Sequence, residues 1–111
     1  MEFDQIKTAV KTHKLEALRQ EEHNYLEAVL FNKDIDALKE TIKGFLGEPV
    51  FPSPQRLSSG IQKAIKDFGG VMPGQTLYFT DGNARAVFAM FWPWQDKQRT
   101  TLKLAEVPFE K

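Results

Sequence analysis

The run of residues 84–94, ARAVFAMFWPW, constrains the fold more than any other part of the chain, because as a strand it has two apolar faces. Side chains alternate between the two faces of a strand, so each face receives every second residue of the run. Both faces therefore need cover, one from the helices of the chain and the other from a further element or a second copy. One face carries Ala84, Ala86, Phe88, Met90, Trp92 and Trp94, and the other carries Arg85, Val87, Ala89 and Phe91.

Composition and charge narrow the classes of protein that this chain can belong to. It has 111 residues, of which 41% are hydrophobic and 27% charged, so it fits one domain with a core of its own. The absence of cysteine excludes disulfides, thiolate metal ligands and a cysteine nucleophile. Fifteen basic residues balance fifteen acidic ones. This neutrality argues against nucleic acid as a partner, and it favours self-association because little charge repulsion keeps copies apart.

Targeting signals are not evident in the sequence. The first residues mix both signs of charge and lack the apolar segment of a signal peptide. No window approaches the roughly 20 apolar residues of a membrane span. We therefore expect a cytoplasmic location and no membrane partner.

The residue pattern in the first third of the chain predicts a helix. Residues 2–23 contain no Gly or Pro, and their apolar side chains share one side of a helical wheel. Residues 24–31 are ambiguous, because a strand would also be apolar on both faces around Glu27. We favour helix there, since Leu, Glu and Ala prefer it and no breaker intervenes.

Two further helices are predicted on either side of a proline-rich connection. Asn32 or Asp34 can cap a helix with apolar residues at helical spacing, and Gly47 stands where a left-handed residue ends it. Ser58 or Ser59 can cap a third, short helix that ends at a Gly-Gly pair. The prolines at positions 49, 52 and 54 force an extended connection between the two helices.

Three strands in a meander follow, which gives an α+β fold class. We predict two or three helices packed on one face of a three-stranded antiparallel β-meander, or a four-stranded one if residues 24–31 form a strand. The expected organisation is a single domain over 1–111. It comprises a helical N-terminal half 2–47, a Pro-rich connection 48–57, a short helix 58–68 and a β-meander 76–107.

The first predicted hairpin turns at Asp81-Gly82, a dipeptide that favours a two-residue turn. Leu77 and Phe79 then share a face with Phe88 and Met90, and we expect the helices to lie on that face. The register that follows pairs Thr80 with Asn83, Phe79 with Ala84, Tyr78 with Arg85 and Leu77 with Ala86.

The second hairpin admits two registers. A four-residue loop over 95–98 sets Trp94 opposite Arg99, which places Leu102 beside Phe91 and Leu104 beside Ala89. A one-residue slip or a bulge near Pro93 would instead move Leu102 and Leu104 to the other face. Pro93 has no N–H for a central ladder, so a bulge or a strand end is expected there.

No motif identifies a chemistry. His13, Glu16, Gln20, His23 and Glu27 would form a stripe on one continuous helix, but a solvated helix face explains it better than a metal site. The serines lack the surroundings of a catalytic nucleophile, and the glycines do not match a phosphate loop. We predict no catalytic residue, cofactor or metal, and a non-enzymatic role is favoured although an enzyme is not excluded.

The leading functional hypothesis is protein association, as a homodimer through the exposed sheet face formed by Val87, Ala89 and Phe91. An inhibitor or adaptor for another protein would use the same residues. The alternative is a small-ligand-binding domain or a modest enzyme, with an aromatic pocket and an arginine that orients an anionic group. The residues expected around that pocket are Tyr78, Arg85, Trp92, Trp94 and Arg99.

Overall fold

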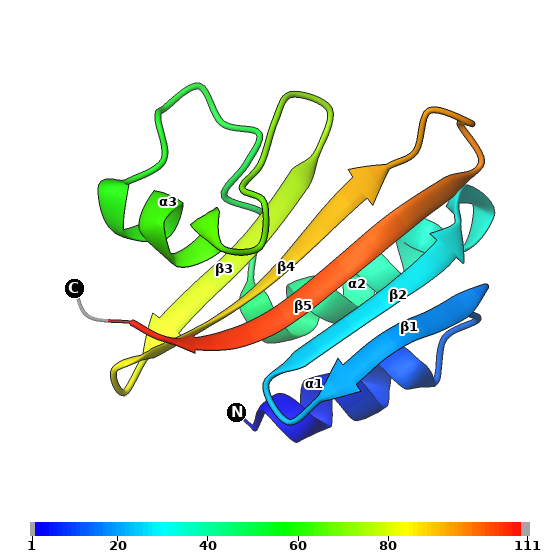
Figure 1. The fold of residues 1–111 in the computed structure, drawn as a ribbon, viewed down its shortest axis with the longest axis horizontal. Coiled ribbons are helices and arrows are strands. Elements are labelled where there is room, and N and C mark those ends of the chain that lie inside the picture. The colour runs from blue at the N-terminus through cyan, green and yellow to red at the C-terminus, as the bar shows by residue number, and fades with distance from the viewer. Residues whose placement is uncertain (1, 110–111) are drawn as a thin grey trace.

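A computed structural model describes residues 2–109 as three α-helices and one antiparallel sheet of five strands (Figure 1). The α+β class is confirmed, and the sheet has more strands than predicted. In chain order the elements are α1 (Phe3–Lys11), β1 (Ala17–Glu22), β2 (Tyr25–Phe31), a 3₁₀ turn at Asn32–Asp34, α2 (Ile35–Leu46), α3 (Ser59–Lys66), β3 (Thr76–Gly82), β4 (Arg85–Pro93) and β5 (Arg99–Pro108).

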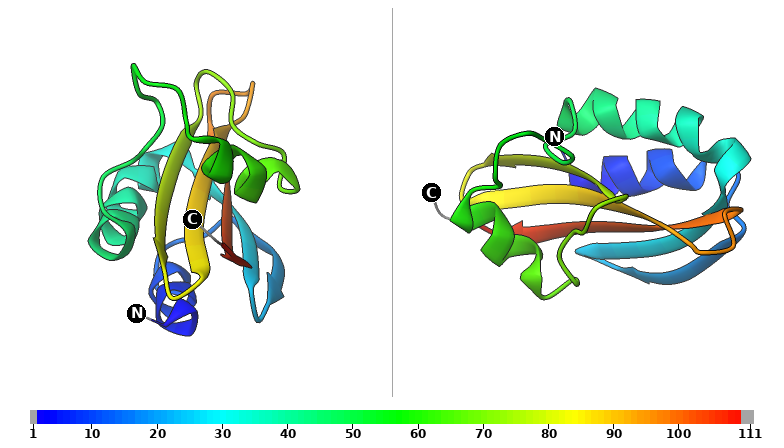
Figure 2. Two further views of the ribbon diagram at one scale, coloured as in Figure 1. Left: turned by 90° about the vertical axis from the view of Figure 1, so that its left-hand side faces the viewer. Right: turned by 90° about the horizontal axis from the view of Figure 1, so that it is seen from above.

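The sheet has the strand order β1-β2-β5-β4-β3, with every neighbouring pair antiparallel. The predicted meander is its β3-β4-β5 part, and the hairpin of β1 and β2 joins it beside β5. Helices α1 and α2 lie on one side of the sheet, and α3 lies on the other (Figure 2). The sheet is thus a middle layer, covered by helix on both sides rather than on one.

The first face of the sheet carries the larger core. Helices α1 and α2 cover it with Phe3, Ile6 and Val10, and with Leu38, Ile42 and Leu46. Beneath them are alternate residues of four strands, which include Phe91 at 1% exposure and Ala89 at 0%. The other sheet residues of this core are Leu26, Ala28, Leu30, Tyr78, Val87, Leu102 and Leu104.

The second face carries a smaller core at the β3 and β4 end of the sheet. Helix α3 contributes the buried Ile65, and the proline-rich segment before it contributes Phe51 and Leu57. They pack on the fully buried Phe88 and Met90. The expectation that the main helices lie on the Phe88 face is wrong, because α1 and α2 take the Phe91 face and leave Phe88 to α3.

Residues 12–31 do not continue the first helix. Helix α1 stops at Lys11, where the Thr12 hydroxyl donates to the Ala9 carbonyl at 2.7 Å and residues 13–16 turn the chain back. Strands β1 and β2 follow, joined by a two-residue turn at His23 and Asn24. The helical N-terminal half predicted over 2–47 is therefore wrong, and the strand alternative for residues 24–31 holds. Its residues are apolar on both faces because β2 is an inner strand.

The other two helices are confirmed. Helix α2 ends at Gly47, whose φ of +85° is the left-handed backbone that glycine tolerates. Helix α3 is capped by Ser58, whose hydroxyl accepts the N–H of Ile61 at 3.2 Å. The proline-rich connection is extended as predicted, and Phe51 within it forms a short bridge with Leu77 on the outer edge of β3.

The turn of the first hairpin lies two residues later than predicted. It is formed by Asn83 and Ala84, both at positive φ, so Gly82 pairs with Arg85 and Phe79 pairs with Phe88. A shift by two residues keeps every side chain on its face. The grouping of Leu77 and Phe79 with Phe88 and Met90 therefore holds, although the predicted pairing of Tyr78 with Arg85 does not.

The second hairpin has the simpler predicted register. Phe91 pairs with Leu102 and Ala89 with Leu104, and the Trp94 N–H donates to the Arg99 carbonyl at 2.8 Å. Strand β4 ends at Pro93 without a bulge. The irregularity of the sheet lies instead in β1, where the register shifts between Leu18 and Gln20.

Among the described residues, no helix is long and apolar enough to cross a membrane.

Because both faces of β4 are covered by the chain's own helices, its two phenylalanines should contribute similarly to stability. Phe88→Ala and Phe91→Ala should each lower the free energy of unfolding by about 3–5 kcal/mol, measured by urea denaturation. Met72→Ala is the control, since Met72 is 65% exposed and should change stability by less than about 0.5 kcal/mol. A Phe91 variant as stable as this control would contradict the placement of α1 and α2.

Candidate functional site

The β1 and β2 end of the second sheet face has no helix over it in the described part of the chain (Figures 1 and 2). We call this surface the open face. Val29 in its middle is only 2% exposed, so the larger side chains around it provide its cover. The strand registers place the following residues on the open face: Ala17, Gln20, Glu22, Tyr25, Glu27, Val29, Phe31, Trp94, Arg99, Thr101 and Lys103.

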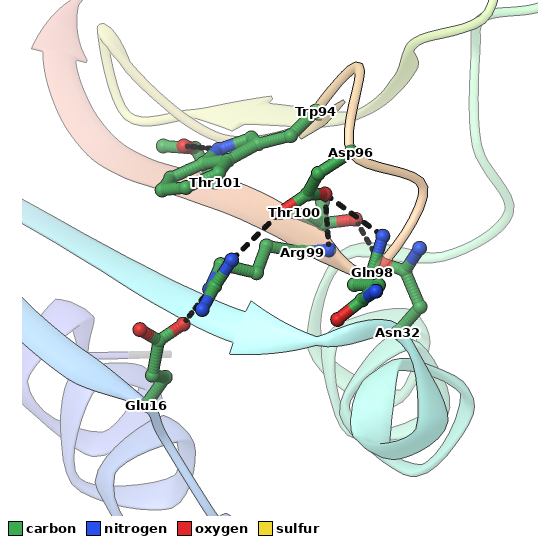
Figure 3. Close-up of polar contacts among 8 residues, drawn as sticks. All are labelled: Glu16, Asn32, Trp94, Asp96, Gln98, Arg99, Thr100 and Thr101. Carbon is green, nitrogen blue, oxygen red and sulfur yellow. Dashed lines mark hydrogen bonds and ion pairs between the residues drawn. The ribbon is translucent and has the colours of Figure 1, made fainter.

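Arg99 forms the centre of a polar cluster on the open face (Figure 3). Its Nε donates to the Glu16 carboxylate at 2.7 Å, and its Nη1 donates to Asp96 at 2.7 Å. The guanidinium carbon lies 5.4 Å from the ring centre of Phe31 and 5.6 Å from that of Trp94. Two carboxylates and two rings thus hold one cation in a fixed position at the surface.

The loop between β4 and β5 positions Asp96 for this contact. Its Oδ1 accepts the backbone N–H of Gln98 at 2.8 Å and that of Arg99 at 3.0 Å, which closes the turn locally. The hydrogen bond from the Gln98 N–H lowers the pKa of Asp96 most. The hydrogen bond from the Arg99 side chain lowers it further. The same carboxylate, followed by Glu16, raises the pKa of Arg99. The charged forms of Asp96 and Arg99 are therefore favoured.

Trp94 and Trp92 lie along the boundary between β4 and the open face. The Trp94 indole donates to the Thr101 hydroxyl at 2.8 Å, which fixes the ring across the end of β5. The Trp92 indole N–H is buried and has no hydrogen-bond partner among the described residues. Its ring lies under the Lys103 ammonium, at 3.7 Å, and against Gly69.

Polar side chains at the other end of the open face are also paired within the chain. The Tyr25 hydroxyl donates to the Glu27 carboxylate at 2.6 Å, and the Tyr25 ring contacts Phe68 with centres 5.5 Å apart. Lys103 donates to the Phe68 carbonyl at 3.0 Å. The open face is thus a fixed surface of rings and satisfied charges.

The interface residues predicted from sequence lie elsewhere. Val87, Ala89 and Phe91 are on the first face, 6%, 0% and 1% exposed, beneath α1 and α2. They are core residues, because this chain supplies the cover that we expected from a second copy. The helices of the chain do leave part of the sheet uncovered, as we expected, but that part lies on the second face.

The predicted ligand pocket is divided by the fold. Trp92, Trp94 and Arg99 do share one face at the end of β4 and β5. Tyr78 is buried on the opposite face, with its ring centre 5.8 Å from that of Phe91. Arg85 lies at the far end of β4, where it pairs with Glu106 at 3.3 Å. These five side chains do not form one pocket.

Sequence analysis missed Phe31 and Glu16 as members of the cluster, because residues 12–31 were assigned to helix. Asp96 carried a signal that we did not use, since an Asp at the second position of a four-residue loop is a common turn-closing residue. The stripe of His13, His23 and their neighbours does not exist as a helix face. No three potential metal ligands converge anywhere in residues 2–109.

Comparison of this chain with protein-family models, with curated proteins and with solved structures finds no match.

Replacing Gly69 should lower the stability of the protein because of the Trp92 ring. A Cβ at Gly69 would overlap that ring, whereas a Cβ at Gly70 meets nothing within 4 Å, and both glycines have positive φ. Gly70→Ala should cost about 1 kcal/mol of stability from its backbone alone, and Gly69→Ala about 1–3 kcal/mol more. Thermal unfolding measures both. In a Trp92→Leu background the two costs should become equal, and a difference that persists would contradict the contact.

The two tyrosines of the chain should both resist ionisation. Burial first, and then the Glu27 carboxylate, raises the pKa of Tyr25 above its ordinary value of 10.0. Burial also raises the pKa of Tyr78. Their contribution to stability is therefore complete below about pH 10 and is lost as the pH rises further, because the unfolded chain then releases protons first. Absorbance at alkaline pH should show tyrosinate appearing together with unfolding, and ionisation near pH 10 in folded protein would contradict this.

Proposed function

We propose that this protein acts by associating with a second copy of itself through the open face. The observation that carries the proposal is the Arg99 guanidinium, held between the Phe31 and Trp94 rings on a face without cover. Arg and Trp supply a large share of the binding energy at protein interfaces. Here both are already fixed, so little side-chain freedom remains to be lost on binding.

The charges of the open face support a second copy rather than a strongly charged partner. The face carries both signs of charge: Arg99 and Lys103 lie on β5, Glu27 and Glu22 lie on β2 and β1, and Glu16 and Asp96 bind Arg99. A two-fold symmetric interface must be complementary to itself. A surface that carries both signs of charge meets this requirement when the cations of one copy face the carboxylates of the other.

The outer edge of the sheet is a weaker candidate for the contact. All six residues of β1 are exposed, and they include Arg19, Glu21 and Glu22. The strand is also irregular between Leu18 and Gln20. Charges and bulges on an edge strand are devices that oppose pairing with another sheet. This favours packing of face on face over extension of the sheet.

The size of the open face predicts a weak dimer. Strand β2 has 7 residues, so three strands of this length cover a patch about 23 Å long and about 14 Å wide. This is smaller than the ~800 Å² that each partner buries in a stable standard interface. We therefore expect a dissociation constant in the micromolar range or above. The proposed location is the cytoplasm, as the sequence predicts.

The test is molar mass by light scattering over a dilution series from about 1 µM to about 1 mM, a range set by the expected affinity. The mass should rise toward that of two chains at high concentration. Trp94→Arg replaces an aromatic side chain of the open face with a charge that the interface would bury, and it should keep the protein monomeric, with its circular dichroism unchanged.

Leu18→Arg is the matched control, since Leu18 is 47% exposed on β1 and faces the α1 and α2 side. This variant should dimerise as the wild type does. A wild type that stays monomeric throughout the series, or a Trp94→Arg variant that still dimerises, would contradict the proposal.

A further inference from the structure

A cleft of about 930 Å³ lies on the α3 side of the sheet, between α3 and the chain segments that flank it. Its volume is within the range of small-molecule sites. Residues 51–57 of the proline-rich connection form one wall, α3 forms another, and residues 69–71 close one end. The apolar part of the lining comprises Phe51, Pro54, Leu57, Ile65 and Val71.

Hydrogen bonds fix the walls of this cleft. The Leu77 N–H donates to the Phe51 carbonyl at 3.0 Å, which ties the connection to β3. The Gln62 side chain donates to the Leu57 carbonyl at 2.7 Å, which ties the same connection to α3. The Gly70 N–H donates to the Ile65 carbonyl at 3.1 Å. The cleft is therefore a formed feature of the fold rather than a gap beside a loose loop.

The charged residues that line the cleft are all cationic. They are Arg56 on the connection and Lys63 and Lys66 on α3, with no carboxylate in the lining. None of the three forms an ion pair within residues 2–109. Lysines in the last turn of a helix also complement its dipole, which explains two of them, but not an arginine from a different segment. In a chain with no net charge, three cationic residues lining one cleft without a carboxylate are a local excess of positive charge.

We propose that this cleft binds a small amphipathic organic anion. The apolar body of the ligand would pack on Leu57, Ile65 and Val71, and its carboxylate, sulfonate or phosphate group would be held by Arg56, Lys63 and Lys66. An apolar lining with a few polar or charged groups is the usual form of such sites. The inference is independent of the proposed dimer, because the cleft and the open face lie on different parts of the sheet.

The test uses a fluorescent dye of this class, anilinonaphthalene sulfonate, and its neutral relative phenylnaphthylamine. The sulfonate should bind the folded wild type at one site per chain and should be displaced by decanoate but not by decanol. Removing the three charges with Arg56→Gln, Lys63→Gln and Lys66→Gln should weaken sulfonate binding by about tenfold and leave the neutral dye unaffected.

The matched control removes three exposed lysines elsewhere, with Lys14→Gln, Lys33→Gln and Lys97→Gln. It changes the net charge equally and should bind the sulfonate as the wild type does. Trp94→Arg should also retain binding, which separates this site from the open face. Near-ultraviolet circular dichroism checks that every variant is folded.

Three results would overturn the inference. The first is equal sulfonate binding by the cleft variant and the control variant. The second is equal affinity for the sulfonate and the neutral dye in the wild type. The third is loss of binding in Trp94→Arg, which would place the dye on the open face.

Discussion

Strand β4 is apolar on both faces, and the rest of the structure depends on how those faces are covered. Phe91 and Phe88 point in opposite directions from the same strand and are both almost completely buried. Such a strand can only be an inner strand with material on both sides. Helices α1 and α2 supply the first side and α3 supplies the second. Three short helices cannot cover both faces of five strands, so part of one face stays open.

Both candidate sites follow from this incomplete cover. Helix α3 has 8 residues. Together with the proline-rich segment that precedes it, this helix covers the β3 and β4 end of the second face. The space between helix and connection is the cationic cleft, and the sheet beyond α3 is the open face. Phe68 stands at the border, where its ring contacts both Tyr25 and Phe88. The two tryptophans lie on either side of this border. Trp92 lies against Gly69, and Trp94 extends over β5, where its indole donates to Thr101.

The sequence predicts those parts of the fold whose signals are local. Four polar residues at 95–98 and the apolar pair Leu102 and Leu104 were enough for the register of β5 against β4. The turn at Asn83 and Ala84 was missed because Asp81-Gly82 is the stronger turn dipeptide. The turn at His23 and Asn24 has neither Gly nor Pro, so the sequence gives no signal that interrupts the helical pattern of apolar residues there.

The sites were harder to predict than the fold because they join distant segments. Trp94 and Arg99 are neighbours across one hairpin, and their shared face could be found from the register. Glu16 is 83 residues from Arg99 and reaches it only because β1 and β2 form a hairpin. Alternation along β4 showed that both faces need cover, but not which helix covers which face. That assignment moved Val87, Ala89 and Phe91 from a proposed interface to the core.

The central claim is that the second face is covered at one end of the sheet and open at the other. Because the chain has no cysteine, single Ala→Cys variants can test it by their reaction with a thiol reagent at low protein concentration. Ala17→Cys on the open face should react as fast as an unfolded chain. Ala105→Cys beneath α3 and Ala89→Cys beneath α1 and α2 should react only as the protein unfolds, since both alanines are 0% exposed. Rapid reaction of Ala105→Cys in the folded protein would contradict the account.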